Sequence, residues 1–357
     1  MKNFSRFPLA LGGLYFFLAS SIAAPHHHVG LVKRDVPDFI QSWPLYQDYQ
    51  TMREGEGGAE LDVPILDSVT LADYDKGSKT LTWGCNRLVL GEQIAVNVAA
   101  IHKATLKPYP EPTVIAKRSY GERYAVIYGG ILQKKCSSNP NVLPVIDYVY
   151  QEDPRRPYGW LILPYVSEGS LETNFGSYSD QNSVNAAFKQ MLNAVAGVQS
   201  EGIIHRDLKP ENFLKDGDTL KLMDFDQSRE TSSSEQYDVG TESYLAPAVP
   251  EILAMKSDTG AAYDYRVDTF SMAMTFMVMS VAELQGSTER YRLWKDVIQP
   301  NGKLWPSADV VADVLKARNY AVFSNNDNLL NVIAKALCAP SERYYPQGFQ
   351  SAFAGVV

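Results

Sequence analysis

Residues 205–212, with the sequence His-Arg-Asp-Leu-Lys-Pro-Glu-Asn, constrain the fold of this chain more than any other segment. Before them, apolar residues between 184 and 198 recur at helical spacing and predict an amphipathic helix. After them, an Asp-Gly-Asp turn at 216–218 separates two short apolar runs and predicts a β-hairpin, which Asp224 follows closely. The pattern therefore predicts a loop that carries a carboxylate and an amide, with a second carboxylate at the end of the hairpin.

The three groups in question, Asp207, Asn212 and Asp224, suit proton acceptance and the binding of a divalent cation. Mg²⁺ prefers oxygen ligands and is commonly held by one or two carboxylates together with substrate phosphates. A multi-histidine metal site is not expected, because three of the five histidines are consecutive, at 26–28.

The octapeptide resembles the catalytic loop of eukaryotic protein kinases letter for letter, and Asp224-Phe225 resembles the start of their metal-binding motif. The resemblance covers roughly residues 85–350. It implies that Asp207 accepts the proton of the substrate hydroxyl, that Asn212 holds a second metal ion, and that Asp224 holds the metal that bridges the phosphates. Lys209 is similar to the serine/threonine-specific branch of the family and would lie beside the transferring phosphoryl group.

Two further segments resemble the nucleotide-binding parts of the same family. Val114-Ile115-Ala116-Lys117 is similar to the strand whose lysine pairs with the α- and β-phosphates of ATP. Leu163-Pro164-Tyr165-Val166 is similar to the gatekeeper and hinge. There the carbonyl of Pro164 and the N–H of Val166 would hydrogen-bond to adenine.

The resemblance also gives supporting roles to residues in the catalytic loop, the activation segment and the helices that brace them: His205, Arg206, Thr241, Glu251, Asp268 and Arg343. Of these, Asp268 would begin a buried helix that braces the catalytic loop. Arg343 would pair with Glu251, which comes three residues later than the family's pattern has it.

The Gly-rich loop of the family is reduced to one glycine, Gly91, in the segment 90–97. Gln93 stands where the backbone should approach phosphate closely, and a Cβ atom hinders that approach. Nucleotide binding is therefore expected to be weaker or differently clamped.

Two other departures concern the surroundings of Lys117. Asp226 replaces the glycine after Asp224-Phe225 and adds a negative charge near the triphosphate, unless a shared metal reverses the sign of that interaction. The helix glutamate that pairs with the lysine is not evident. Counting along the helix leads to Tyr128, and Glu122 is the alternative.

The predicted fold class is α+β, with a small β-rich N-lobe and a larger α-helical C-lobe, as in protein kinases. The boundaries are a signal peptide at 1–23, a candidate propeptide at 24–34, an extension without an assigned role at 35–80, the N-lobe at 81–165 and the C-lobe at 166–357.

The amino-terminal segment predicts entry into the secretory pathway. Lys2 and Arg6 precede an uncharged stretch at 7–24 that ends in small residues, which is the pattern of a signal peptide cleaved after Ala23. The alternative is an uncleaved membrane anchor. After cleavage we expect no membrane association, and the candidate propeptide at 24–34 ends in a dibasic pair.

Three cysteines in a chain sent to an oxidising compartment raise the question of a disulfide. If one forms, we expect Cys85 to pair with Cys136 and Cys338 to remain a buried thiol.

The formal charge is −8, and it becomes −12 without residues 1–34, so the body lacks the cationic field that non-specific nucleic-acid binding needs. The resemblance to protein kinases implies ATP-dependent phosphoryl transfer to Ser or Thr of a protein substrate, with ATP and Mg²⁺ or Mn²⁺. We expect a monomer that is secreted or acts in the secretory lumen. The alternative is a catalytically weak or inactive kinase-fold binding module. A small-molecule phosphotransferase is less well supported, because residues 209–211 resemble the protein-substrate branch.

Overall fold

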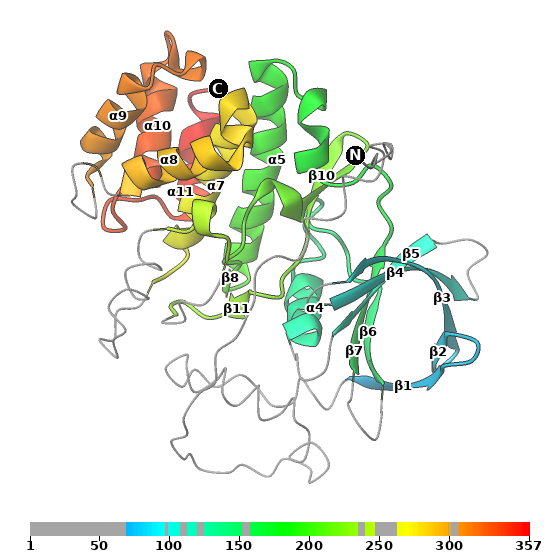
Figure 1. The fold of residues 1–357 in the computed structure, drawn as a ribbon. Coiled ribbons are helices and arrows are strands. Elements are labelled where there is room, and N and C mark those ends of the chain that lie inside the picture. The colour runs from blue at the N-terminus through cyan, green and yellow to red at the C-terminus, as the bar shows by residue number, and fades with distance from the viewer. Residues whose placement is uncertain are drawn as a thin grey trace, which may run out of the picture.

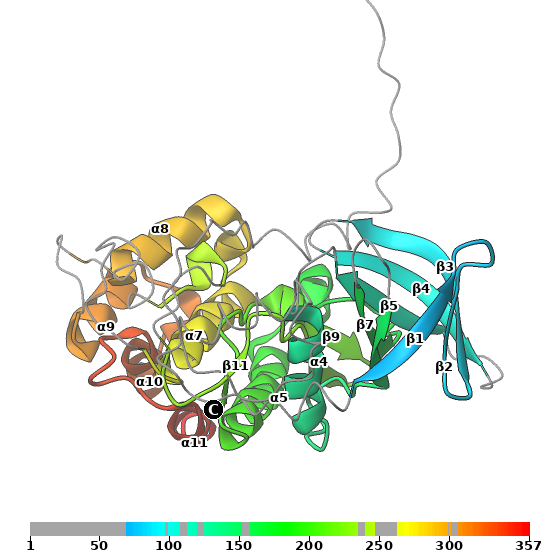
Figure 2. The same cartoon turned by 90° about the horizontal axis from the view of Figure 1, so that it is seen from below.

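The computed structural model describes residues 69–96, 99–107, 113–119, 125–151, 158–234, 240–246, 263–298, 300 and 306–357. In these residues the chain forms two lobes, one built mainly of β-strands and one mainly of helices (Figure 1). Figure 2 shows the two lobes beside each other, with helix α4 (Ala125–Lys135) of the first lobe next to helix α5 (Gln181–Ser200) of the second. The α+β, two-lobed prediction is confirmed.

The small lobe is a closed barrel in the order β1-β2-β3-β4-β5-β7-β6, in which β6 pairs in parallel with β1. Its strands are β1 (Thr70–Asp75), β2 (Thr80–Trp83), β3 (Asn86–Val96), β4 (Ala99–Lys107), β5 (Thr113–Ser119), β6 (Asp147–Gln151) and β7 (Tyr158–Pro164). Strand β1 belongs to the barrel, so the boundary predicted at residue 81 is too late. Closure of the barrel requires the pairing of β1 with both β2 and β6.

Alternation along the strands directs side chains into two separate cores. In β7, Trp160 and Ile162 point into the barrel, whereas Leu161 and Leu163 pack on its outer side. In β5, Ala116 belongs to the barrel interior, so its neighbour Lys117 points to the outer side, opposite Leu161. The strand period therefore places the Lys117 side chain toward the large lobe.

The large lobe is built of helices around a common apolar core. The described helices are α5 (Gln181–Ser200), α7 (Arg266–Ser280), α8 (Ser287–Ile298), α9 (Ala308–Ala317), α10 (Asp327–Leu337) and α11 (Pro346–Ala354). Asp180 caps the N-terminus of helix α5, because its side chain accepts hydrogen bonds from the backbone N–H groups of Asn182 and Ser183. The helix ends before Gly202, which has a φ of 75°.

Aromatic rings join three of these helices. Phe188 of α5, Phe276 of α7, and Phe349 and Phe353 of α11 have ring centroids between 4.8 and 6.4 Å apart. Such tilted and edge-on contacts add to the burial of apolar surface. Helix α7 is buried all round, as its apolar sequence predicts. None of the helices in the described residues is long and apolar enough to cross a membrane.

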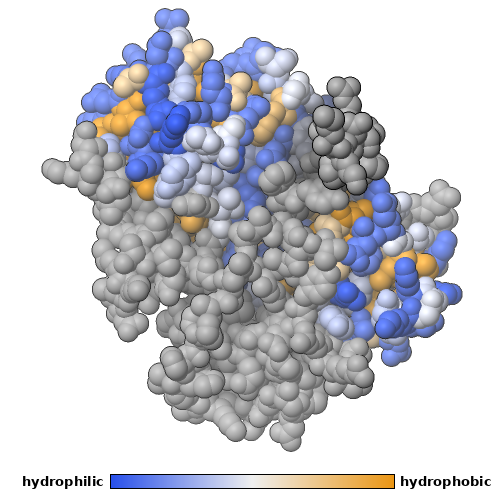
Figure 3. Space-filling view, viewed as in Figure 1, coloured by the Kyte–Doolittle hydropathy of each residue, from blue (hydrophilic) through white to orange (hydrophobic). Residues whose placement is uncertain are grey.

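The surface of the described part of the helical lobe is mostly hydrophilic in the view of Figure 3. The large apolar side chains that are exposed on the described residues are spread over separate elements: Leu71, Ile146, Tyr291, Val310 and Tyr345. Single exposed apolar residues are normal on a soluble surface and indicate no docking patch.

The expected disulfide is absent from the described structure, in which all three cysteines are free thiols. Cys85 is exposed between β2 and β3, whereas Cys136 is buried at the end of helix α4 (Ala125–Lys135). The prediction of a Cys85–Cys136 pair is therefore wrong in this structure, because the two residues occupy different environments. Cys338 is a buried thiol, as predicted.

Helix α4 approaches the backbone of the Asp224-Phe225-Asp226 segment through a glycine. A Cβ atom at Gly129 would lie 2.8 Å from the carbonyl carbon and oxygen of Phe225 and 2.9 Å from the backbone nitrogen of Asp226. Real Cβ atoms do not approach backbone so closely, so the helix or the segment would have to move. Glycine at this position therefore sets the distance between α4 and the motif.

We predict that Gly129→Ala lowers the free energy of unfolding by about 1–3 kcal/mol through this overlap. Without the overlap, the same change inside a helix would stabilise the protein by up to about 1 kcal/mol. Urea denaturation measures the difference. Gly176→Ala is the matched control, since a Cβ atom there would have nothing within 4 Å. Stabilisation by Gly129→Ala would contradict the prediction.

Candidate active site

The catalytic-loop segment follows strand β8 (Ile203–Ile204), which pairs with β11 (Arg229–Glu230). Asp268, in the first turn of α7, holds this segment in place. Its carboxylate accepts hydrogen bonds from the backbone N–H groups of His205, at 2.7 Å, and Arg206, at 2.8 Å. Arg206 has a φ of 71°, which is uncommon for a non-glycine residue and persists only where its surroundings fix it. The bracing contact implied for Asp268 is therefore present.

Arg206 connects the loop to the segment that follows Asp224. Its Nε donates to the carbonyl oxygen of Gln227 at 2.5 Å, and its Nη1 donates to Ser234 Oγ at 3.2 Å and to Tyr263 Oη at 3.3 Å. Ser234 and Tyr263 also exchange backbone hydrogen bonds. The Ser234 hydroxyl therefore contacts the guanidinium of Arg206.

His205 is fully buried beneath the loop. Its Nε2 lies 3.3 Å from the carbonyl oxygen of Met223, and its ring meets Phe225 edge-on with centroids 4.8 Å apart. Burial lowers the pKa of His205 to about 4, although the charges of Asp207 and Asp224 act in the opposite direction. The imidazole is therefore neutral at pH 7 and serves as a packing residue.

Asp207 lies at the centre of a hydrogen-bonded cluster. Lys209 Nζ donates to Asp207 Oδ2 at 2.9 Å and to Thr241 Oγ1 at 2.8 Å, and the Thr241 hydroxyl donates to Asp207 Oδ1 at 2.7 Å. Asn212 Nδ2 donates to the backbone carbonyl of Asp207 at 2.7 Å and contacts Oδ2 at 3.3 Å. The carboxylate of Asp207 is therefore fixed in orientation and lies beside the ammonium of Lys209.

The side chain of Asn212 is held by its amide nitrogen, and its oxygen atom is not used within the loop. The side chain is fully buried, its amide nitrogen is used within the loop, and Oδ1 has no hydrogen-bond partner among the described residues. A buried acceptor without a partner is costly unless a ligand or ion satisfies it. Its position fits the role of a metal ligand.

Lys117 reaches across from β5 to the end of the hairpin formed by β9 (Phe213–Asp216) and β10 (Thr219–Leu222). Its Nζ lies 2.7 Å from Asp224 Oδ1 and 2.7 Å from Asp226 Oδ2. Burial alone would lower the pKa of Lys117, but the two carboxylates outweigh it and raise that pKa. Lys117 is therefore a buried ammonium between two acids.

The two acids differ in their ionisation. Burial acts to raise the pKa of Asp224, but the charge and hydrogen bond of Lys117 outweigh it and lower that pKa. For Asp226, burial and the neighbouring charge of Asp224 prevail over Lys117 and raise the pKa to about 6. Asp226 Oδ1 is buried without a hydrogen-bond partner among the described residues.

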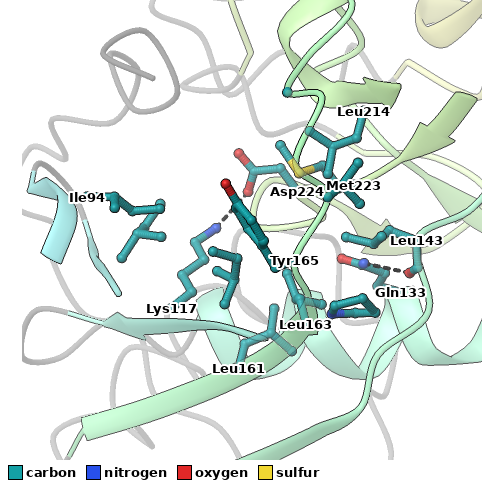
Figure 4. Close-up of a pocket in the computed structure, with 15 residues that line it drawn as sticks. Ile94, Lys117, Gln133, Leu143, Leu161, Leu163, Tyr165, Leu214, Met223 and Asp224 are labelled. Carbon is teal, nitrogen blue, oxygen red and sulfur yellow. Dashed lines mark hydrogen bonds and ion pairs between the residues drawn. The ribbon is translucent and has the colours of Figure 1, made fainter. Parts of the chain in front are cut away.

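An apolar pocket adjoins this charged cluster (Figure 4). Its apolar lining comes from both lobes: Ile94, Ile101, Ile115, Leu143, Leu161, Leu163, Val166, Leu214 and Met223. Lys117 and Asp224 also line the pocket, and Figure 4 shows the Lys117 side chain directed at Asp224. A flat apolar ring would fit in this pocket between the lobes. A polar group attached to such a ring would then reach the ammonium of Lys117 and the carboxylate of Asp224.

Of the predicted nucleotide-binding residues, Pro164 and Val166 line this pocket together with Lys117. Gly91 is not among the residues that line it. A Cβ atom at Gly91 would lie 3.0 Å from the carbonyl oxygen of Lys103 on β4, next to a register shift in the β3–β4 pairing. This glycine therefore serves strand pairing in the structure, and a contact between it and a nucleotide stays a prediction.

Glu122 and Glu251 lie outside the described residues, so their pairing with Lys117 and Arg343 stays a prediction. Arg343 is buried, donates from Nε to the carbonyl oxygen of Cys338 at 2.9 Å, and lies 5.0 Å from the centroid of the Phe270 ring. Burial lowers the pKa of Arg343 to about 9.

Tyr128 occupies the helix position reached by counting, and its side chain contacts strand β11. Its hydroxyl accepts a hydrogen bond from the backbone N–H of Glu230 at 3.3 Å, and the guanidinium of Arg229 lies 5.5 Å from its ring centroid. From the sequence, Asp226 was expected only to add a negative charge near the triphosphate, and its contact with Lys117 was not foreseen. The sequence did carry a signal for this contact. The helix position where the family has its glutamate holds Tyr128, so Lys117 requires an acid from elsewhere.

The donor set fits a divalent cation bound together with phosphates. Asp224 and Asn212 Oδ1 are oxygen donors of the kind Mg²⁺ prefers. The described residues contain no cluster of three or more histidine, cysteine or acidic residues able to hold a metal without help. Phosphate oxygens would have to complete the coordination.

Comparison with known families agrees with this site. Residues 114–342, more than half of the chain, match the family model described as protein kinase domain, so the chain belongs to the protein kinase family. Phosphoryl transfer to protein is the activity of that family.

Among curated relatives, the chain is 34% identical over 161 residues to serine/threonine-protein kinase CHK1 of Saccharomyces cerevisiae, covering 42% of this chain and 28% of that protein. It is 29% identical over 194 residues to serine/threonine-protein kinase CST20 of Candida albicans, covering 52% and 14%. It is 28% identical over 173 residues to human eIF-2-alpha kinase GCN2, covering 42% and 10%. The chain therefore matches less than a third of the length of these relatives.

We predict that acid destabilises the protein through His205 by about 3 kcal/mol between pH 6.5 and pH 4. Burial holds the folded pKa near 4, below the ordinary 6.5, so the unfolded chain binds more protons in this window. The stability present above pH 6.5 is therefore lost as the pH falls through the folded pKa. Urea unfolding is compared for the protein and for His205→Phe, whose side chain cannot titrate. Between pH 6.5 and pH 4 the variant should lose about 3 kcal/mol less of its free energy of unfolding than the unaltered protein. Equal losses would contradict the assignment.

Proposed function

We propose that this chain is a protein serine/threonine kinase of the secretory pathway that transfers the γ-phosphoryl group of ATP to a hydroxyl of a protein substrate. The observation that carries the proposal is the convergence of Lys117, Asp207, Asn212 and Asp224 beside one apolar pocket. The serine/threonine preference is supported by the Lys209–Asp207–Thr241 cluster and by the relatives named above.

The reaction assigns a part to each of these groups. The bond between the γ-phosphorus and the β–γ bridging oxygen breaks, and a bond forms between that phosphorus and the substrate oxygen. Asp207 accepts the proton of the attacking hydroxyl, and Lys209 balances negative charge on the transferring group. Lys117 binds phosphate oxygens and fixes the position of the triphosphate of ATP. When bound by Asp224 and Asn212, a divalent cation supplies charge neutralisation on the phosphates.

Secretion is supported by the basic and then uncharged stretch that opens the chain, which lies outside the described residues. Action in the secretory lumen, where ATP is more abundant than outside the cell, would meet the need for the co-substrate.

The experiment is phosphate transfer from labelled ATP to a panel of Ser- and Thr-containing proteins, with Mg²⁺ and with Mn²⁺. The enzyme is recovered from the culture medium of cells that express the whole chain, with its first residue expected at Ala24 or Asp35. We predict that Asp207→Asn lowers kcat by about 10²- to 10⁴-fold, because the base is removed.

Asp218→Asn is the matched control, since it makes the same chemical change in the exposed turn of the β9–β10 hairpin and should leave kcat unchanged. Failure of the unaltered protein to exceed Asp207→Asn in either metal would contradict the proposal.

A kinase-fold binding module is the second candidate, favoured by the engagement of Lys117 with two carboxylates and by the position of Gly91 away from the pocket lining. In the same preparations, ATP at 100 times its Kd should add about 2.7 kcal/mol of stability. Stabilisation without turnover would favour the binding module over the enzyme.

A further inference from the structure

We propose that Asp226 is the positioning residue of Lys117, and that it supplies from the metal-binding segment the carboxylate that protein kinases take from a helix. The inference rests on the proposed nucleotide site and deepens it. It assigns a role to the residue that most clearly breaks the family's motif.

The contacts of Lys117 provide the first argument. Its ammonium is buried and lies 2.7 Å from a carboxylate oxygen of Asp224 and 2.7 Å from one of Asp226. A buried ammonium requires a close acid. Since Asp224 is the group expected to turn to a metal, a lysine that depended on Asp224 alone would lose its partner when the metal binds. Asp226 remains available.

Helix α4 provides the second argument, because it offers no acid to the lysine. The described residues of the helix, 125–135, contain neither Asp nor Glu. Tyr128 is directed to β11, where its hydroxyl accepts from the Glu230 N–H. At Gly129 even a Cβ atom would overlap the backbone of Phe225 and Asp226. The helix therefore lies against the motif where a side chain has no room.

The close approach at Gly129 and the contact between Asp226 and Lys117 are complementary. The absence of a side chain at Gly129 lets the helix lie against the motif backbone, and the side chain of Asp226 supplies a carboxylate to Lys117 from that motif. In this arrangement the orientation of Lys117 depends on the motif itself. We infer that Asp224 and Asp226 divide their work, with Asp224 directed to the metal and Asp226 kept on Lys117.

A competing account treats Asp226 only as a negative charge near the phosphates, which would repel them. The two accounts predict opposite effects on the affinity for ATP when that charge is removed. Asp226→Asn keeps the shape of the side chain and removes its charge, so it separates them.

The first experiment measures the Kd of ATP and of adenosine, each with Mg²⁺, for the protein and for Asp226→Asn. We expect ATP to bind at least ten-fold more weakly to the variant, because Lys117 loses its orientation toward phosphate. Adenosine should bind within two-fold, because it uses only the apolar pocket. Tighter ATP binding by the variant would overturn the inference, and so would equal weakening of ATP and adenosine, which would indicate a packing role.

The second experiment needs no nucleotide and therefore separates this inference from the proposed function. The melting temperatures of Lys117→Met, Asp226→Asn and the double variant are compared with that of the unaltered protein. We expect Asp226→Asn to lower the melting temperature when Lys117 is present and not to lower it further in Lys117→Met. Additive losses would overturn the pairing. Absence of nucleotide binding by the unaltered protein would instead count against the proposed function alone.

Discussion

The ammonium of Lys117, buried between two carboxylates, is the interaction on which the arrangement of the site depends. It joins strand β5 of the small lobe to the end of the β9–β10 hairpin in the large lobe. A buried charge without close partners would be strongly unfavourable, so the pair requires the two lobes to meet at this point. The apolar pocket lies beside the same contact, lined by residues of both lobes. The ion pair and the pocket therefore lie at the same junction between the two lobes.

The rest of the site is set by backbone geometry that the large lobe enforces. Arg206 and Asp224 both have positive φ, at 71° and 64°. Such conformations are costly for non-glycine residues and persist where surrounding contacts fix them. Asp268 supplies two of these contacts from the start of the buried helix α7, and Lys117 supplies another from the small lobe. The packing of apolar helices therefore determines the direction of the catalytic side chains.

Local patterns in the sequence were sufficient to predict much of this. The spacing of apolar residues predicted helix α5, and the Asp-Gly-Asp turn predicted the β9–β10 hairpin, because both depend on neighbouring residues. The family's motifs gave the residues that the structure brings together in the catalytic loop, since that segment matches the family without a gap. The contact of Asp268 with the loop followed from the same resemblance.

What the sequence did not reveal depends on contacts between distant residues. The barrel begins at Thr70 because β1 pairs with β6, more than seventy residues later in the chain, and no local pattern specifies that pairing. Cys85 and Cys136 both lie in the first half of the chain, which favoured a disulfide between them, although one is exposed and the other is buried. Asp226 was noted as an added charge, but its contact with Lys117 requires knowing that helix α4 offers no acid and lies against the motif. The role of Asp226 therefore depends on the groups that lie opposite its side chain, which only the structure shows.

The most direct test of this account is a crystal structure of the protein with a non-hydrolysable ATP analogue and Mn²⁺. The account predicts the adenine ring among the apolar residues of the pocket, with Asp224 and Asn212 oxygens on the metal. It also predicts Lys117 within hydrogen-bond distance of both a phosphate and the Asp226 carboxylate. A structure in which Lys117 is directed away from the phosphates, or in which Asp224 has no access to the metal, would contradict it.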